Sequence, residues 1–125
     1  MVLEECRARV ASLTRELALV SVSGELDLYA SDAVKRGIHE ADAVGADTVV
    51  VDLSEISFID STALGVLVGG VKRLRPNGGR LSIVSSDRNI TKIFEITGLD
   101  RVFTIYPSRD EAVSKLKAAA DTPPA

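Results

Sequence analysis

The hydrophobic pattern of the N-terminal residues predicts two strands. Apolar residues alternate with arginines from Cys6 to Val10, which is typical of a half-exposed edge strand with its charges outward. Leu17–Ser23 is predicted as a second strand, paired with the first through a turn near residues 13–16. Gly24 ends this strand, so the chain is expected to open with a β-hairpin.

The rest of the chain alternates between helical and strand patterns. Val34, Ile38 and Ala41 share one face of a helix that we expect from Ser31, or a neighbouring residue, to about residue 44. Gly45 is placed to end this helix. Further strands are predicted at residues 47–53, 81–85 and 102–105, and further helices are predicted to begin near residues 61, 87 and 108.

This order of elements predicts a small α/β domain with a mixed, largely parallel sheet of about five strands and about four helices. A chain of 125 residues can bury one core without metals or disulfides. We expect a single domain at residues 1–120 and a frayed tail at residues 121–125.

The segment from Val49 to Gly65, VVVDLSEISFIDSTALG, carries the strongest local signals. Its three valines have no polar alternation, which favours a strand covered on both faces. A helix is predicted to begin at Asp60 or Ser61, because both are good N-cap residues. The first-turn N–H groups and the helix dipole favour an anion there, so the serine hydroxyl suits reversible phosphorylation.

Two glycines lie inside the helix predicted after residue 60. Gly65 and Gly69 are four residues apart and so share one face, which we expect to allow a close approach to the sheet. The apolar stripe of the same helix is predicted to comprise Leu64, Leu67, Val68, Val71 and Leu74.

Composition narrows the function and the location. Fifteen basic and 18 acidic residues give a net charge of −3, and no basic block indicates nucleic-acid binding. Cys6 is the only cysteine, so no intrachain disulfide can form and a reducing compartment is favoured. No apolar run resembles a signal core or a membrane span, so a cytoplasmic location without direct membrane insertion is expected.

Residues 52–74, DLSEISFIDSTALGVLVGGVKRL, closely resemble the phosphorylation segment of the STAS-domain anti-sigma factor antagonists. Three further segments resemble the family in the same order. Residues 24–27 (GELD) resemble the turn before the first helix, and residues 78–81 (GGRL) resemble the turn into the next strand. Residues 90–99 (ITKIFEITGL) resemble the third helix and its Gly-Leu end. The resemblance covers roughly residues 17–116 and implies the STAS fold.

The resemblance implies a phosphorylation switch rather than an enzyme. Unmodified, the domain would bind an anti-sigma factor and release the sigma factor that it holds. The anti-sigma factor, a GHKL-type serine kinase, would phosphorylate Ser61 and lose its grip, and a serine phosphatase would reset the switch. The resemblance also implies a partner-binding surface that includes Glu25 and Asp27, because their loop borders the phosphoserine helix in this fold. Asp60, which directly precedes the modified serine, and Thr62 are expected to belong to the same surface. The alternative roles are that Asp60 fixes the loop and that the Thr62 hydroxyl helps to cap the helix.

Other chemistries find no support in the pattern. A serine hydrolase needs a base and, in the α/β-hydrolases, a G-x-S-x-G motif, yet Ser61 has neither flanking glycine. His39 is the only histidine and is expected at the surface, so no catalytic partner or transition-metal site is predicted, and no cofactor. Residues 65–72 lack the G-K-[S/T] sequence of a phosphate-binding loop.

The alternative function is a STAS scaffold or accessory subunit of a signalling assembly or of a membrane transport complex. A small-molecule or nucleotide-binding domain has no motif to support it.

Overall fold

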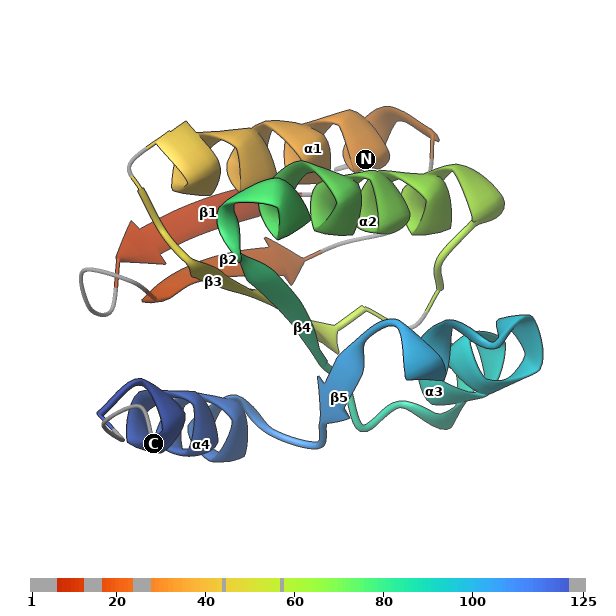
Figure 1. Cartoon of the computed structure of the whole chain (residues 1–125). Coiled ribbons are helices and arrows are strands. Elements are labelled where there is room, and N and C mark those ends of the chain that lie inside the picture. Colours follow the sequence, from red (N-terminus) through yellow and green to blue (C-terminus); the bar gives the residue numbers. More distant parts are fainter. Residues whose placement is uncertain (1–6, 13–16, 24–27, 44, 57, 122–125) are drawn as a thin grey trace.

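The computed structural model describes residues 7–12, 17–23, 28–43, 45–56 and 58–121, which contain a five-stranded sheet in the order β1-β2-β3-β4-β5 (Figure 1). Its strands are β1 (Arg7–Ser12), β2 (Leu17–Ser23), β3 (Thr48–Glu55), β4 (Arg80–Val84) and β5 (Thr104–Tyr106). The edge strand β1 pairs with β2 antiparallel, whereas the pairs β2–β3, β3–β4 and β4–β5 are parallel. The predicted mixed, largely parallel sheet is therefore confirmed.

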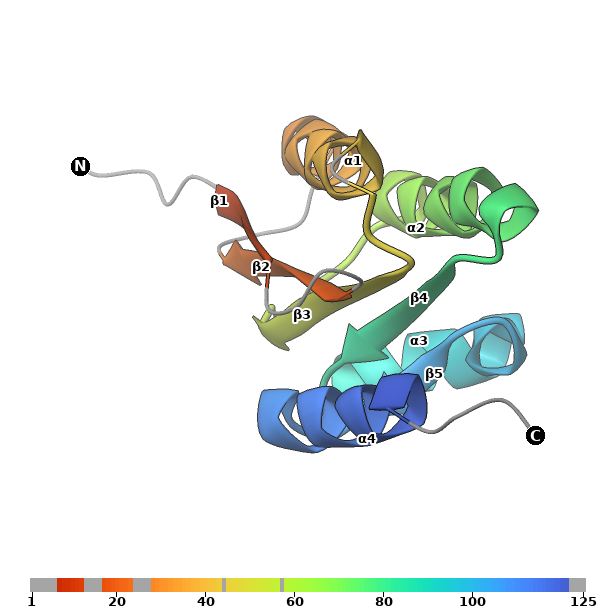
Figure 2. The same cartoon turned by 60° about the vertical axis from the view of Figure 1, so that its left-hand side comes forward.

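Four α-helices in these residues cover the sheet. They are α1 (Leu28–Ala43), α2 (Ser61–Leu74), α3 (Arg88–Thr97) and α4 (Arg109–Asp121), with short 3₁₀ turns η1 (Arg75–Asn77) and η2 (Leu99–Arg101). Helices α1 and α2 lie side by side on one face, and α4 lies on the other (Figures 1 and 2). The crossover connections β2–α1–β3 and β3–α2–β4 join parallel strands, and such connections are right-handed. Because both connections advance toward β5, they place α1 and α2 on the same face of the sheet.

The hydrophobic core has two parts. The larger part packs the α1, α2 and α3 stripes against the sheet and includes the predicted α1 residues Val34, Ile38 and Ala41, all of them buried. The smaller part packs Ala112 of α4 against Val50 and Leu19. Burial on both faces explains the unbroken valine run of β3. Val49 and Val51 pack into the larger part of the core, and Val50, on the opposite face, packs into the smaller part.

Local sequence signals set several helix ends where they were predicted. The Asp87 side chain accepts a hydrogen bond from the N–H of Asn89 and caps α3. Gly98 ends the same helix in the left-handed conformation, with φ at 75°, a region that glycine enters without steric strain. Ser108 Oγ accepts a hydrogen bond from the N–H of Glu111 at the start of α4, in agreement with the predicted cap.

Two expectations about the helices are corrected. Helix α1 begins at Leu28 rather than near Ser31, which instead lies buried within the helix. The α2 glycine that approaches the core is Gly70, where a Cβ atom would lie 3.0 Å from Leu81 Cδ1 and 3.1 Å from Ile38 Cδ1. Gly65 and Gly69 are exposed, and a Cβ atom on either would meet nothing within 4 Å. The two glycines do share one face of α2, but that face is exposed and does not approach the sheet.

Candidate functional site

The site is built at the connection between β3 and α2. Strand β3 is buried through Leu53 and reaches the surface at Ser54 and Glu55. The loop that follows is held to the core by Ile56 and Ile59, which are 1% and 4% exposed. A hydrogen bond from the Ile56 N–H to the Leu53 carbonyl oxygen, 2.9 Å long, tightens the turn out of the strand. The start of α2 is therefore held in a defined position at the C-terminal edge of the sheet.

Asp60 is the N-cap of α2. Its backbone is extended (φ −97°, ψ 175°), and its Oδ1 accepts a hydrogen bond of 2.8 Å from the Ala63 N–H. The Asp60 carbonyl oxygen accepts the first helical hydrogen bond, from the Leu64 N–H at 3.1 Å. Because the aspartate supplies the cap, the hydroxyl of Ser61 is not needed for it.

Ser61 is the first residue of α2, and both Ser61 and Thr62 are exposed. The first N–H groups of a helix have no acceptor within the helix, and the helix dipole makes this end positive. An anion attached to the Ser61 oxygen would therefore lie in a favourable field. The arrangement therefore suits a modified hydroxyl.

Glu25 and Asp27, the predicted acidic pair, lie outside the described residues. The position of the residue that precedes their segment is described, because that residue is Ser23, the last residue of β2. Ser23 is paired with Glu55, the last residue of β3, so the two loops leave the sheet at the same edge. This register agrees with the expectation that the acidic pair and the start of α2 share one surface, which stays a prediction.

An ion pair between a buried aspartate and a half-exposed arginine, which the sequence did not predict, lies at the same end of β3. Asp52 is 2% exposed, and its Oδ2 lies 2.7 Å from both Nε and Nη2 of Arg109, the first residue of α4. Oδ1 accepts a hydrogen bond of 2.9 Å from the Ser54 N–H, and Arg109 Nη2 donates another of 3.1 Å to Ser21 Oγ. Burial raises the pKa of the Asp52 carboxyl, but the hydrogen bonds from Ser54 and Arg109 and the charge of Arg109 outweigh it, so the pKa lies below its ordinary value. The pair joins α4 to the strand that leads into the loop.

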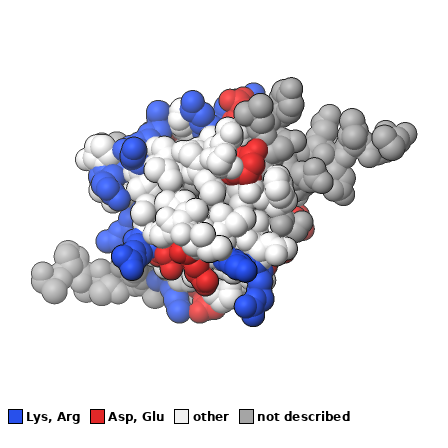
Figure 3. Space-filling view, turned by 90° about the vertical axis from the view of Figure 1, so that its right-hand side faces the viewer, with Lys and Arg blue, Asp and Glu red and all other residues white. Residues whose placement is uncertain are grey.

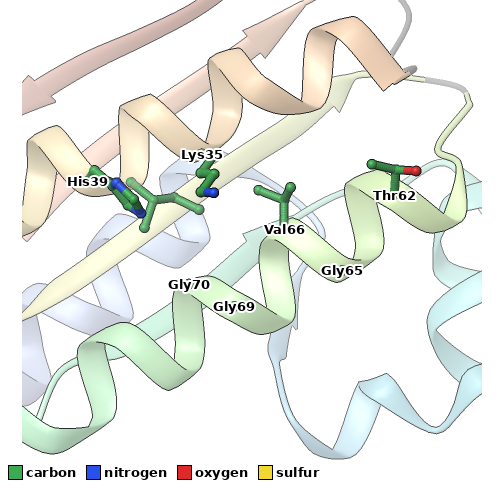
Figure 4. A pocket seen from close by; sticks show the side chains of 8 residues that line it. Lys35, His39, Thr62, Gly65, Val66, Gly69 and Gly70 are labelled. Atoms are coloured by element: carbon green, nitrogen blue, oxygen red, sulfur yellow. The ribbon is translucent and has the colours of Figure 1, made fainter.

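A groove of about 290 Å³ separates α1 from α2 on the outer surface and begins beside the site (Figure 4). Lys35 and His39 extend from α1 toward it, and Thr62 and Val66 line it from α2. His39 is half-buried here, so it is less exposed than the sequence indicated. The exposed glycines of α2 form part of the same wall and leave the helix backbone accessible.

The surface on the side where α2 begins is largely uncharged in its middle, outside the part drawn in grey (Figure 3). Lysine and arginine side chains gather mainly along the upper and left margin with a second group at the lower right, and acidic side chains form small separate groups (Figure 3). No group of three or more potential metal-ligating side chains occurs in the described residues. Among the same residues, no helix is long and apolar enough to cross a bilayer.

Comparison with known proteins agrees with this geometry. The STAS domain family model matches residues 8–112. The anti-sigma F factor antagonist of Paenibacillus polymyxa is 28% identical over 107 residues, which are 85% of this chain and 92% of that protein. The anti-sigma-B factor antagonist of Bacillus subtilis is 33% identical over 94 residues, 75% of this chain and 85% of that protein. The crystal structure of an anti-sigma factor antagonist from Mycobacterium paratuberculosis superposes with a TM-score of 0.80 at 27% identity, covering 90% of this chain and 95% of that one. The chain with its Asp60-Ser61-Thr62 helix start therefore belongs to the STAS domain family of the anti-sigma factor antagonists.

Proposed function

We propose that this protein is a cytoplasmic anti-sigma factor antagonist and that phosphorylation of Ser61 switches its partner binding off. The observation that carries the proposal is that Ser61 is exposed at the start of α2. Its hydroxyl is not needed to cap the helix, because Asp60 supplies the cap. The family membership and the names of the similar relatives support the choice of partner. The unmodified domain binds the anti-sigma factor and so releases the sigma factor, with no catalysis of its own.

The covalent step belongs to the partner, a GHKL-type serine kinase. The γ-phosphoryl group of ATP passes to Ser61 Oγ, ADP leaves and the hydroxyl proton is released. A metal-dependent serine phosphatase then hydrolyses the phosphoserine to serine and inorganic phosphate. This chain supplies the hydroxyl, its position and its accessibility.

The added charge acts at the interface rather than on the fold. Phosphate brings about −1.5 to −2 charges at neutral pH. At a helix N-terminus these charges leave the helix intact or stabilise it slightly. They lie beside the Asp60 carboxylate, however, so the surface presented to the partner becomes more negative. A change of about 3 kcal/mol in binding free energy would weaken the complex roughly a hundredfold.

The partner-binding surface that we propose surrounds Ser61. It includes Asp60 and Thr62 at the start of α2, and Glu25 and Asp27 from the loop that leaves the same edge of the sheet. It continues along the exposed side of α2 beside the groove that Thr62 and Val66 line.

Incubation with the anti-sigma factor kinase and ATP, followed by peptide mapping, tests the assignment. We expect stoichiometric phosphate on Ser61, and none on Ser61→Ala, which should bind the kinase but resist inactivation. Since Asp60 is the cap, the substitution should change the free energy of unfolding by less than about 0.5 kcal/mol. Ser114→Ala, an exposed serine of α4, is the matched control and should behave as the wild type.

Two results would contradict the proposal. One is stoichiometric phosphate on another residue with Ser61 unmodified. The other is affinity capture in which the wild type and Ser61→Asp both retain transport-complex subunits and neither retains a kinase, which would favour the accessory-subunit alternative.

A further inference from the structure

Phe58, in the loop between β3 and α2, is 55% exposed although it is a large aromatic residue. Ile96 and Val102 are the other exposed large hydrophobic residues among those described, and a single exposed apolar residue needs no special explanation. What distinguishes Phe58 is its place in the sequence, three residues before the exposed Ser61. Ile56 and Ile59 on either side of Phe58 are buried in the core, and Asp60 is fixed as the cap of α2. The loop thus holds the aromatic ring in solvent three residues before Ser61.

We propose that Phe58 is the apolar anchor by which the anti-sigma factor kinase docks at Ser61, and that the kinase receives it in an apolar pocket beside its phosphoryl-transfer site. This inference rests on the function proposed above. A kinase that transfers phosphate to Ser61 Oγ must bring its own surface into contact with that oxygen. The Cα atoms of Phe58 and Ser61 are at most about 11 Å apart, because each residue spans no more than about 3.8 Å. A specific interface covers about 800 Å² on each partner, so its footprint includes residues at that distance.

The size of the side chain gives it weight within that footprint. An aromatic residue buries about 150–250 Å², and aromatic residues are frequent among the few that carry most of the binding free energy. Ile59 and Asp60, which follow the ring, are already fixed by burial and by the helix cap before binding, which limits the backbone entropy lost on association. Phe58 therefore supplies affinity in the unmodified state, and the phosphate on Ser61 opposes it by charge. The two functions are separate, so that docking and switching can be altered independently.

The control for this proposal is Val102, which is 43% exposed. It lies beside Arg75 and Gly79, at the opposite end of α2 from Ser61. Removing apolar surface there matches the chemistry of a Phe58 truncation and leaves the proposed contact intact. Neither side chain is buried, so neither substitution should lower the melting temperature appreciably.

Calorimetric titration of the purified anti-sigma factor kinase, in the presence of MgADP, measures the dissociation constant for each variant. We expect Phe58→Ala to weaken binding by at least about tenfold. Phe58→Leu should recover most of the affinity, and Val102→Ala should bind like the wild type. In the phosphorylation of Ser61, Phe58→Ala should raise KM with little change in kcat, because the ring contributes to binding before and during phosphoryl transfer.

Each other outcome overturns the inference in a recognisable way. If Phe58→Ala binds as tightly as the wild type, the anchor is wrong while the proposed function stands. If binding falls only in proportion to melting temperature, the ring is structural. If Phe58→Ala abolishes self-association of this chain in sedimentation experiments without changing kinase affinity, the ring contacts a second copy. If the wild type neither binds nor is phosphorylated, the proposed function itself is wrong.

Discussion

At the scale of single residues, adjacent side chains at the start of α2 have different tasks. Asp60 accepts the hydrogen bond of the Ala63 N–H and fixes the helix start, whereas Ser61 is exposed and is not needed for the cap. A serine that capped its own helix would have its oxygen engaged by a backbone N–H and would lose that bond on modification. Under the proposed function, this division would let Ser61 be phosphorylated and dephosphorylated without loss of the Asp60 cap.

Asp52 carries a second residue-scale prediction, which concerns pH. Its folded-state pKa lies below the ordinary value of 3.8, so the unfolded chain binds the proton more tightly. The charged carboxylate therefore contributes stability at pH values above 3.8, and this contribution is lost as the pH falls through the lower, folded-state pKa. We expect Asp52→Asn to lower the free energy of unfolding by about 1–3 kcal/mol at pH 7, because Arg109 loses its buried partner. The difference from wild type should shrink on acidification to about pH 3.

Urea denaturation at both pH values measures this difference. Asp42→Asn is the matched control, because Asp42 also pairs with an arginine, Arg73, at 2.9 Å, but its carboxylate is more exposed than that of Asp52. A surface pair of this kind contributes less than about 1 kcal/mol. An Asp52→Asn deficit that is equally large at both pH values would show that the carboxylate charge is not the source of the stabilisation.

At the scale of elements, α2 contains glycines in two different environments. Gly65 is exposed, and a Cβ atom there would meet nothing within 4 Å, whereas a Cβ atom added at Gly70 would lie 3.0 Å from Leu81 Cδ1 and 3.1 Å from Ile38 Cδ1. We expect Gly65→Ala to raise the free energy of unfolding by about 1 kcal/mol, the difference in helix propensity between the two residues. Gly70→Ala should gain nothing or destabilise, because both neighbouring side chains are buried in a close-packed core.

Chemical denaturation of the two single variants compares these environments directly. Gly69→Ala repeats the Gly65 test at a second exposed position and should also stabilise. Equal stabilisation by Gly65→Ala and Gly70→Ala would mean that the core beside α2 accommodates a methyl group without strain, contrary to the contacts described above.

The elements were predictable where their signals are local. The Asp87 cap, the Gly98 end of α3 and the Asp60-Ser61 start of α2 each depend on residues within one turn of each other, and all were expected from sequence. The sequence did not predict the direction of the Gly65 face or the pairing of Asp52 with Arg109. Asp52 and Arg109 are 57 positions apart, so their contact depends on the placement of α4 across the sheet. The exposure of Phe58 was not predictable for a similar reason. An aromatic residue between isoleucines is typical of a buried segment, and its exposure depends on how the loop packs against the core.

At the scale of the whole molecule, the sheet topology brings the proposed partner surface together from distant segments. The parallel register of β2 and β3 directs both following loops to one edge, where the acidic segment and the start of α2 are expected to meet. The arrangement resembles binding sites of other α/β proteins, which lie at the C-terminal ends of parallel strands. Fold alone does not specify a partner, so the choice of an anti-sigma factor depends on the sequence relatives and on the residues of the site.

The last prediction concerns charge on this surface. Asp27→Lys should slow association with the anti-sigma factor, because GHKL partners are expected to present basic residues near their nucleotide site. Opposite charges at an interface accelerate encounter, and reversing one of them at low salt should lower the association rate by about tenfold. The wild-type complex should also weaken as salt rises, mainly through slower association, since exposed charges separated by more than about 8–10 Å are screened at physiological ionic strength.

Asp47→Lys makes the same change of charge at the opposite, N-terminal end of β3 and serves as the control, because Asp47 is exposed and directly precedes this strand. Stopped-flow association rates across a salt series for the wild type and both variants separate the two positions. We expect Asp27→Lys to have the slower rate and the shallower salt dependence, with a melting temperature close to that of wild type, because loop charges contribute little to folding. If Asp27→Lys and Asp47→Lys change the association rate equally, only the net charge of −3 matters, and the proposed acidic contact does not exist.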